Sequence, residues 1–561
     1  MRYSNVVVSE PRLAESQIRF RLGLVRQRTR TYPLDSMDFV MMDLERPHGC
    51  YRHAHWCTGD LTGRLLEFLS YADGVDGQSD PRMKELFERI LLQARPSGAI
   101  GRYAAQPNPV APEEDIASAV PRLLPGLIQY HELTGDARAL DAAVGMARYT
   151  LARKDAWHKR MKDKGGWAIE AWVTEPMAML YGVTGETAYL DFAGMIAECL
   201  QPPVRAHSHG YLSTLRGLQV AALVTGDRAW TEKVDRYRQF IIDRQLVMPD
   251  GCVPEVFPPA QRNEGCSIAD WIMVNLNAGL LNNDDTAYAA AEHALWNAFA
   301  FNQFITGALG TREITATGYG VHHIEECVWC CTYDAGLALS EVARQAVTWR
   351  GGAIHVNLLV PGDYRLRLPG GAVAQVRIGT AYPARAEATV EAVGVPSDVA
   401  VKLRVPECIR RAQVQETRMQ DRVRVQLRGV LGHHVRTTPR GKMLCYGPLV
   451  MAPIGYNWSG GLTEADRDSV PVGYIPEVMP KGLPQFALPE PNADGLLALS
   501  EEPLPAWTFH DGGPNARCAV AGSPANVPIR FPDGQVRTLR FVPECYFTSC
   551  LAFYDTPVVF S

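Results

Sequence analysis

The short sequences Thr134-Gly135-Asp136, Thr184-Gly185-Glu186 and Thr225-Gly226-Asp227 recur about 40 to 50 residues apart in the first part of the chain. Glycine readily adopts the left-handed conformation that ends a helix, and an acidic residue after it favours the start of the next helix. The first two sequences follow amphipathic stretches, residues 119–133 and 169–183. The pattern therefore predicts helix, tight turn and helix, repeated as stacked hairpins.

The helical pattern continues to about residue 350. Stacked hairpins can form either an open solenoid or a closed ring of paired helices. Aromatic and histidine residues recur near the predicted helix starts, where the central funnel of a closed ring would collect them. We therefore expect an (α/α)6 helical barrel over residues 1–350.

From Gly351-Gly352 onwards, apolar residues alternate with polar ones, which is typical of β-strands. Two Pro-Gly turns, at 361–363 and 369–371, separate the first of these stretches. The predicted strands are residues 353–360, 364–368, 374–378, 386–393, 399–405 and 423–427. Their short length and close spacing predict a β-sandwich domain over residues 351–470.

The tail, residues 471–561, is rich in Pro and Gly and contains strand-like stretches at 537–542 and 558–560. It predicts a third, β-rich region, with a second sandwich as one form. A chain of 561 residues exceeds the usual size of a single core. The overall expectation is a multidomain α+β protein, in which the helical barrel is followed by β-sandwich structure.

Charge and hydropathy exclude several classes of partner. Fifty-six basic and 61 acidic residues give a net charge of -5, which provides no basic surface for nucleic acid or an anionic membrane. The first 16 residues lack an apolar run of signal-peptide length, and no segment approaches the roughly 20 apolar residues of a membrane span. We expect a cytoplasmic protein with a small polar or neutral substrate. The oligomeric state is left open, with a homodimer as one option.

The cysteines are more informative in their clustering than in their number. Thirteen cysteines, an odd count in a long chain, favour free or metal-bound thiols over disulfides. Two short clusters stand out, Glu264-Gly265-Cys266 and the stretch from Cys327 to Cys330-Cys331. Tetrahedral zinc accepts a set of thiolates with one carboxylate. Ordinary buried thiols would explain the same spacing, so the clusters alone leave the choice open.

Glu255 lies shortly before the first cluster, in Pro254-Glu255-Val256-Phe257. Apolar neighbours desolvate a carboxyl group and favour its protonated form, as a general acid requires. A surface glutamate in a Pro-rich loop is the alternative. Glu325 and Glu326, just before the second cluster, rank second as the acid or base.

These motifs, taken in order along most of the chain, resemble glycoside hydrolase family 127 and its relative family 146, the β-L-arabinofuranosidase group with a zinc-bound cysteine nucleophile. The resemblance rests on Glu264-x-Cys266, the Trp-Cys-Cys-Thr run at 329–332, Glu255-x-Phe257, and the sandwich motifs at 403–406 (Leu-Arg-Val-Pro) and 447–450 (Gly-Pro-Leu-Val). Two features differ from the arabinofuranosidases. The segment between Glu255 and Glu264 is shorter, and Gly265 replaces a larger residue.

The resemblance implies a retaining, exo-acting glycosidase in which Cys330 is the nucleophile and Glu255 the acid/base. Its zinc ligands would be Glu264, Cys266, Cys330 and Cys331. The predicted contacts to a small saccharide substrate are His207, His209, Trp56, Asp60 and Trp167. Tryptophans at helical spacing are often core residues, and two nearby histidines can also bind metal or cap a helix.

Three alternatives compete with this interpretation. Polysaccharide lyases also join helical toroids to β-sandwiches, and would use a Tyr or His base on a uronate. A non-catalytic saccharide-binding protein could hold the same zinc structurally, since four protein ligands normally close a structural site. A histidine-based metal site is less favoured, because no pair has the i, i+4 spacing of a helical metal motif; its candidates are His53, His55, His322 and His323.

Overall fold

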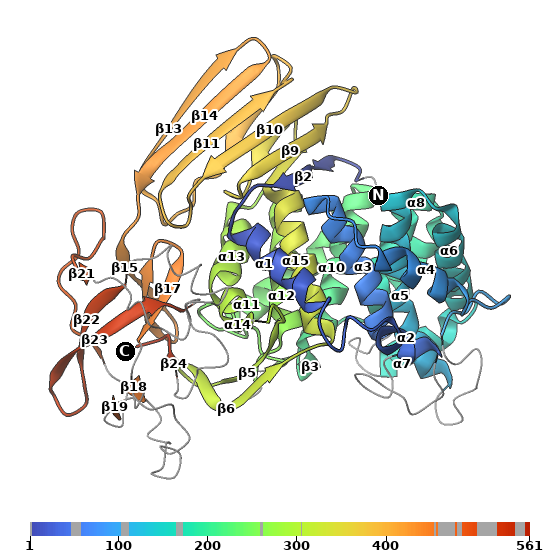
Figure 1. Ribbon diagram of the computed structural model, residues 1–561, viewed down its shortest axis with the longest axis horizontal. Helices are drawn as coiled ribbons and strands as arrows, with labels where there is room; N and C mark the ends of the chain where they lie inside the picture. Colours follow the sequence, from blue (N-terminus) through green and yellow to red (C-terminus); the bar gives the residue numbers. More distant parts are fainter. Residues whose placement is uncertain are drawn as a thin grey trace.

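The computed structural model joins a ring of helices to several β-sheets (Figure 1). The structure describes residues 3–45, 58–101, 112–163, 172–257, 262–304, 306–453, 456–457, 477–478, 485–501, 524–544 and 556–560. Within these ranges, no helix has both the length and the apolar character needed to span a lipid bilayer.

The three repeated turns join helices as the sequence predicts. Helix α5 (Pro112–Thr134) ends before Gly135, and α6 (Ala137–Leu151) begins after Asp136, whose side chain accepts a hydrogen bond from the backbone of Arg138. The corresponding turns join α8 (Thr174–Thr184) to α9 (Thr187–Glu198) and α10 (Ser208–Thr225) to α11 (Ala229–Asp243). The glycines at positions 135, 185 and 226 all have a φ of 74°, the left-handed conformation that glycine adopts without strain.

In the described part of the chain, six helices form a closed inner ring, because each packs on the next and the last packs on the first. They are α3 (Asp60–Asp76), α5, α8, α10, α12 (Gly265–Asn282) and α15 (Cys330–Ala346). Six outer helices pack on them in turn: α4 (Arg82–Leu91), α6, α9, α11, α13 (Asp285–Ala294) and α1 (Gln17–Arg28). This arrangement confirms the predicted (α/α)6 barrel.

Burial follows the position of each helix in the ring. Inner helix α10 is buried at every residue from Ser208 to Leu223, because neighbouring helices surround it. Outer helix α4 buries only one face, formed by Met83, Leu86, Phe87 and Ile90. The spacing of these four residues is that of an amphipathic helix with one side in water. Shorter helical elements complete the unit: α2 (Met37–Glu45), α7 (Lys154–Asp163), a π-helical turn (Leu295–Phe299) and α14 (Ala300–Asn302).

Two sheets follow the barrel, and the first residues of the chain join both of them. One sheet has the order β1-β7-β8-β12, and the other β13-β14-β11-β10-β9-β2. Strand β9 contacts β1 and β7, and β14 contacts β12, so the sheets pack against each other as in a sandwich. The strands are β1 (Val6–Val8), β2 (Glu10–Leu13), β7 (Val347–Arg350), β8 (Ala353–Val356), β9 (Gly362–Arg367), β10 (Val373–Thr380), β11 (Glu387–Val393), β12 (Ala400–Leu403), β13 (Arg410–Met419) and β14 (Arg422–Val430).

A third sheet is formed by later strands, which Figure 1 shows beside the barrel and below the two-sheet unit. Its strands are β15 (His433–Thr438), β16 (Gly441–Tyr446), β17 (Leu449–Pro453), β20 (Gln485–Phe486), β21 (Ser500–Glu501), β22 (Ala525–Arg530) and β23 (Val536–Pro543). A short parallel pair is formed by β18 (Tyr456–Asn457) and β19 (Glu477–Val478). The division into domains at residues 350 and 470 stays a prediction.

A hairpin inserted between α14 and α15 connects the barrel to the C-terminal strands. Its strands are β5 (Gly310–Ile314) and β6 (Gly318–Glu326), and β6 leads directly into the second cysteine cluster. Strand β24 (Thr556–Pro557) pairs with β6 on its other side. The C-terminal end of the chain therefore packs against the segment that precedes the cysteines.

Candidate functional site

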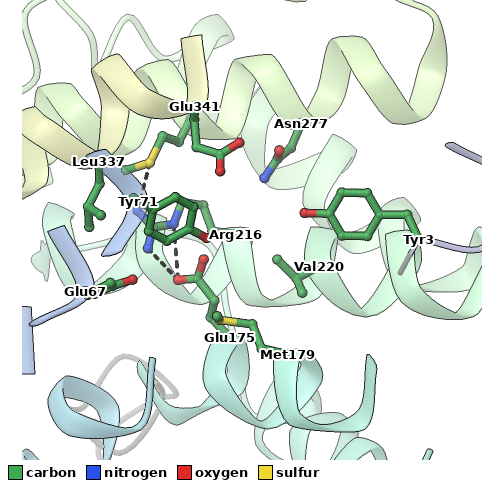
Figure 2. Close-up of a pocket in the computed structure, with 11 residues that line it drawn as sticks. Tyr3, Glu67, Tyr71, Glu175, Met179, Arg216, Val220, Asn277, Leu337 and Glu341 are labelled. Carbon is green, nitrogen blue, oxygen red and sulfur yellow. Dashed lines mark hydrogen bonds and ion pairs between the residues drawn. The ribbon is translucent and has the colours of Figure 1, made fainter. Parts of the chain in front are cut away.

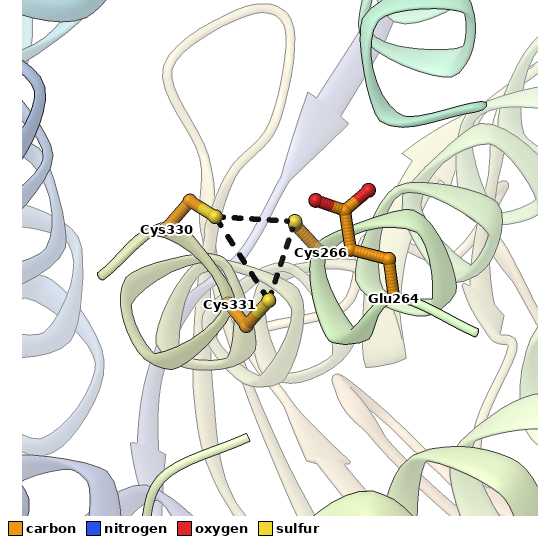
Figure 3. A group of neighbouring side chains, drawn as sticks. All are labelled: Glu264, Cys266, Cys330 and Cys331. Atoms are coloured by element: carbon orange, nitrogen blue, oxygen red, sulfur yellow. Dashed lines mark hydrogen bonds between the residues drawn. The ribbon is translucent and has the colours of Figure 1, made fainter. Parts of the chain in front are cut away.

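The four predicted metal ligands lie together at the start of two neighbouring inner helices (Figure 3). The Sγ atom of Cys266 is 3.5 Å from that of Cys330 and 3.4 Å from that of Cys331, and the last two are 3.9 Å apart. A carboxylate oxygen of Glu264 lies within 4.8 Å of all three sulfur atoms. The side chains are buried, with Glu264 at 8%, Cys330 at 4%, Cys331 at 1% and Cys266 at 0% exposure.

Helix termini place these groups. Glu264 is the N-cap residue of α12 and Cys266 lies in its first turn, while Cys330 and Cys331 are the first two residues of α15. The two helices pack side by side in the inner ring. The unpaired N–H groups and the dipole at a helix N-terminus stabilise negative charge, including a thiolate. Both sequence clusters therefore present their ligands at helix N-termini, which offset part of the cost of burying a negative charge.

The donor set fits a tetrahedral metal ion. Ligand atoms about 2.3 Å from a tetrahedral centre are separated by about 3.8 Å, and the three sulfur separations of 3.4, 3.5 and 3.9 Å lie around that value. Burial, together with the neighbouring thiols of Cys330 and Cys331, raises the pKa of Cys266 far above its ordinary value. Three packed thiols therefore need a cation to become thiolates, and the cluster has the composition to hold one.

His207 connects the cluster to the next part of the site. Its Nε2 atom is 3.1 Å from Oε2 of Glu264, and the side chain of His207 is 32% exposed. Burial opposes ionisation of Glu264, but His207 holds the pKa of that carboxyl far below its usual range. His207 occupies β3 (Ala206–His207), which pairs with β4 (Val256–Phe257) and so lies next to Glu255 in the fold.

Glu255 has a partner that sequence reasoning missed. Arg262 donates two hydrogen bonds to its carboxylate, from Nε at 2.5 Å and from Nη2 at 2.7 Å. The backbone is held as well, because the N–H of Ser208 donates to the Glu255 carbonyl and the N–H of Glu255 donates to the Arg262 carbonyl. The carboxyl thus faces a guanidinium group rather than the apolar surroundings that its sequence neighbours suggest. Its side chain is 24% exposed.

Glu325 and Glu326, the alternative candidates for the acid or base, have different partners. Glu325 lies 3.9 Å from Nη1 of Arg262, so the same guanidinium reaches both Glu255 and Glu325. Glu326 instead pairs with Arg28 at 2.7 Å. The structure therefore leaves Glu325 as the second candidate and commits Glu326 to another ion pair.

His209 and Asp60 lie in a buried ion network beneath the cysteines. The Nδ1 atom of His209 is 2.5 Å from Asp270, and its Nε2 atom is 2.9 Å from Arg64. Arg64 also binds Asp60 at 2.9 Å and Asp334 at 2.6 Å. Burial lowers the pKa of His209 well below its ordinary value. Both ring nitrogens of His209 are engaged inside the protein, and Asp60 is fully buried. The network orients the site from below.

The sequence contained a signal for this network. Asp270 follows Cys266, and Asp334 follows Cys330, by four residues, which places each aspartate one helical turn below its cysteine. Asp60 and Arg64 have the same spacing. The recurrence of Cys-x3-Asp in both clusters could have been read as a second layer of the site.

The structure describes only some of the remaining predicted residues. Trp56 and Trp167, and the histidines of the competing metal site at positions 53 and 55, lie outside the described residues. His323 forms a 2.6 Å hydrogen bond with Thr311 of the β5–β6 hairpin. The roles of all the predicted site residues remain predictions.

A polar cavity lies further along the inner helices, and we refer to it as the axial pocket (Figure 2). It has a volume of about 30 Å³. Its polar lining consists of Tyr3, Glu67, Tyr71, Glu175, Arg216, Asn277 and Glu341. Arg216 links it to the site network, because Nη1 is 2.8 Å from Asp270 and Nη2 pairs with Glu175.

Comparison with known proteins agrees with this geometry. The family model for the β-L-arabinofuranosidase GH127 catalytic domain matches residues 58–209. No curated protein matches the chain at a significant level. The family match, together with the fold, confirms the predicted resemblance to family 127 and the prediction of a glycoside hydrolase.

Three solved structures share the fold over nearly their whole length. A GH127 β-L-arabinofuranosidase from Geobacillus stearothermophilus T6 is 14% identical, with 98% of this chain and 99% of that chain covered and a TM-score of 0.69. A GH127 β-arabinofuranosidase and a protein described as a glycoside hydrolase are each 13% identical, with 99% and 97% covered and a TM-score of 0.65. At these identities the likeness establishes the fold.

Proposed function

We propose that this distant relative of family 127 is a retaining glycoside hydrolase of the β-L-arabinofuranosidase kind, with Cys330 as nucleophile and Glu255 as acid/base. Glu264, Cys266, Cys330 and Cys331 would hold a zinc ion. When bound, zinc would supply the positive charge that keeps the sulfur atoms as thiolates at neutral pH. The substrate would be a small saccharide that loses its terminal sugar.

The observation that carries this proposal is the convergence of three sulfur atoms and one carboxylate beside His207 and Glu255. Burial lowers the pKa of His207, but the charges of Glu264, Cys330 and Glu255 all raise it, so His207 lies close to these three groups. The exposed fraction rises from the cluster towards Glu255. It is 0% at Cys266, 4% at Cys330 and 24% for the side chain of Glu255. A sugar would therefore approach from the side of His207 and Glu255.

The proposed chemistry proceeds in two displacements at the anomeric carbon. In the first, the Cys330 sulfur forms a bond to that carbon while the bond to the leaving oxygen breaks, and Glu255 gives its proton to that oxygen. In the second, Glu255 takes a proton from water, the water oxygen bonds to the anomeric carbon and the carbon–sulfur bond breaks. Two inversions give net retention of configuration.

Arg262 has a defined place in this cycle. A carboxylate that accepts two hydrogen bonds from a guanidinium group cannot donate a proton, so Glu255 must leave Arg262 to act as an acid. Glu325 stands 3.9 Å from the same arginine and offers it a second partner. The Glu255–Arg262 pair would re-form whenever Glu255 is ionised.

One observation favours a non-catalytic alternative, a saccharide-binding protein with a structural metal. All four ligands are at most 8% exposed, and structural zinc sites are typically closed by four protein ligands. In that case no sulfur would react, and neither the parent protein nor a Cys330 variant would hydrolyse a glycoside.

Replacement of the nucleophile separates the two possibilities. Cys330→Ser should lower the hydrolysis of aryl furanosides by about four orders of magnitude, because serine is not activated in this setting. Circular dichroism and the thermal midpoint should stay close to those of the parent protein. Cys199→Ser, which changes a buried thiol that lies outside the metal cluster, is the matched control and should retain full activity.

The acid/base assignment has its own test. Glu255→Gln with a dinitrophenyl glycoside should form the sugar adduct and release it slowly, because the good leaving group needs no acid but the second step needs a base. Mass spectrometry should then find one sugar on the peptide that contains Cys330. Glu325→Gln should turn over normally. Full activity of Cys330→Ser, or a sugar on another residue, would refute the proposal.

A further inference from the structure

Two carboxyl groups meet in the interior at a junction that the proposed chemistry does not use. Asp250 lies in the turn that precedes Glu255, and Glu544 directly follows β23 in the third sheet. Both residues are completely buried, at 0% exposure. The contact therefore joins the helical barrel to the C-terminal β-structure through two acids.

The hydrogen bonds at this contact are unequal. Asp250 accepts from the backbone N–H of Cys252 at 3.2 Å and from the hydroxyl of Tyr319 on β6. Glu544 is different, because in the described part of the chain neither of its carboxyl oxygens has a hydrogen-bond donor. Its carboxyl lies within hydrogen-bonding reach of Asp250. A proton held between the two acids would satisfy Glu544.

Among the charged and titratable groups around Glu544, Asp250 favours its protonation and Arg312 opposes it. The groups are Asp250 and Cys252 from the turn, Arg312 from β5, Tyr319 from β6 and Cys445 from β16. Nη2 of Arg312 donates at 3.0 Å to the carbonyl of Phe301, and its guanidinium lies 4.0 Å from the centre of that ring. Burial, followed by the charge of Asp250, raises the pKa of Glu544 well above its usual range.

The contact is connected to both halves of the proposed site. Residues 250–257, which we call the acid segment, run from Asp250 to Glu255 and β4. Tyr319 lies on β6, which carries Glu325 and leads into the second cysteine cluster. Asn263 ties the two together, because its Nδ2 donates to Sγ of Cys252 at 3.2 Å and its Oδ1 accepts from the N–H of Arg312 at 2.7 Å.

We propose that Glu544 is a positioning residue, whose protonated carboxyl donates to Asp250 and holds the acid segment against the β5–β6 hairpin. The catalytic consequence rests on the proposed function, whereas the protonated contact does not. Through Asp250 and Tyr319, the C-terminal β-structure sets where Glu255 stands relative to the cysteines. A carboxyl group that is fully buried and distant from the chemistry thereby affects the rate.

The protonated contact makes stability depend on pH in a defined direction. An acid whose pKa is raised by folding contributes its full stabilisation below the pKa of the unfolded chain and loses it as the pH rises towards the folded pKa. The contribution of this contact to the stability of the parent protein should therefore fall from pH 5 to pH 9. Glutamine at position 544 can donate to Asp250 without titrating, so it should reduce this dependence.

The experiment compares Glu544→Gln, Glu544→Ala and the surface control Glu490→Gln in the full chain. The urea midpoint at pH 9, relative to that at pH 5, should be lower for the parent and the control than for Glu544→Gln. With an aryl furanoside, Glu544→Ala should lower kcat by about tenfold with KM within twofold, since small misplacements of reacting groups are costly. Glu544→Gln should restore kcat to within about threefold of the parent.

Hydrogen exchange measures the positioning without a substrate. Backbone amides of residues 250–257 should exchange faster in Glu544→Ala than in the parent, and at parental rates in Glu544→Gln. If no glycoside is hydrolysed, the proposed function fails, while the urea and exchange data still decide the contact. Equal pH dependence in the parent and Glu544→Gln, or unchanged exchange and kcat in Glu544→Ala, would overturn the inference.

Discussion

Glu264, at the cysteine cluster, and Glu67, in the axial pocket, are both carboxyl groups inside the same ring of helices. Glu264 is 3.1 Å from His207 and has a pKa far below its usual range. Burial, with the nearby charge of Glu175, raises the pKa of Glu67 to about 8, and no described residue donates a hydrogen bond to it (Figure 2). The pKa of a carboxyl inside this barrel therefore reflects the balance between its burial and the charges around it.

The two regions also differ in what their charges can do. At the cysteine cluster, helix N-termini and a histidine favour negative ligands, which is what a bound cation requires. In the axial pocket, Arg216 pairs with Glu175 and Asp270 and Arg344 pairs with Glu341, while Glu67 forms no ion pair with a described residue. The first region is suited to chemistry and the second to structure.

The largest expected effect removes a ligand from the cysteine cluster. Cys266→Ala should abolish binding of one metal ion per chain and lower the hydrolysis of aryl furanosides by about a thousandfold or more, because the remaining thiols lose the charge that ionises them. Metal analysis of the purified protein and kinetics on the same sample measure both. Retained metal with full activity would show that the two regions do not differ as described.

A smaller effect is expected from breaking the network between the two regions. Arg64→Met leaves Asp60 and Asp334 buried without their shared partner, which should destabilise the fold by about 3–5 kcal/mol. Arg89→Met is the matched control, since Arg89 forms ion pairs near the surface with Asp38, Glu45 and Glu85, and their loss should cost less than about 1 kcal/mol. Urea unfolding at neutral pH measures the free energy of unfolding of both variants. An equal loss in the two would contradict the burial of the Arg64 ion pairs.

The smallest effect concerns the axial pocket. Stability that depends on the raised pKa of Glu67 is complete below the unfolded pKa and is lost as the pH rises towards about 8. The parent should be about 3 kcal/mol less stable at pH 8 than a Glu67→Gln variant, once both are referenced to pH 5. Thermal unfolding measures the difference, with the exposed Glu85→Gln as control. Activity per folded molecule should not change, because the pocket is structural.

The helical part of the fold was predictable because its signals are local. A glycine that ends one helix and an acidic residue before the next act within a few residues, as at Gly135 and Asp136. Alternating strands such as β10 and β11 were predicted for the same reason. Strand β13 was missed, because its sequence is polar and nearly every residue is exposed, so no apolar alternation marks it.

The sequence predicted which residues form the metal cluster but not what surrounds them. Cysteine and glutamate are unusual enough in short clusters for their chemistry to be inferred from residue type, and the structure brings Cys266 to Cys330 and Cys331. The partners of the other site residues were not predictable. Arg262 beside Glu255 and Arg64 beside His209 depend on side-chain directions across different elements.

The sequence by itself determined that helices pair around tight turns, that strands follow them and that thiols and a carboxylate suited to a metal are present. These properties depend on residues close together in the chain. Tertiary structure alone decided the closure of the ring, the ionisation of Glu264 against the protonation of Glu67, and the meeting of Asp250 with Glu544. The reason is that burial and charge pairing act through space, between groups that are far apart in the sequence.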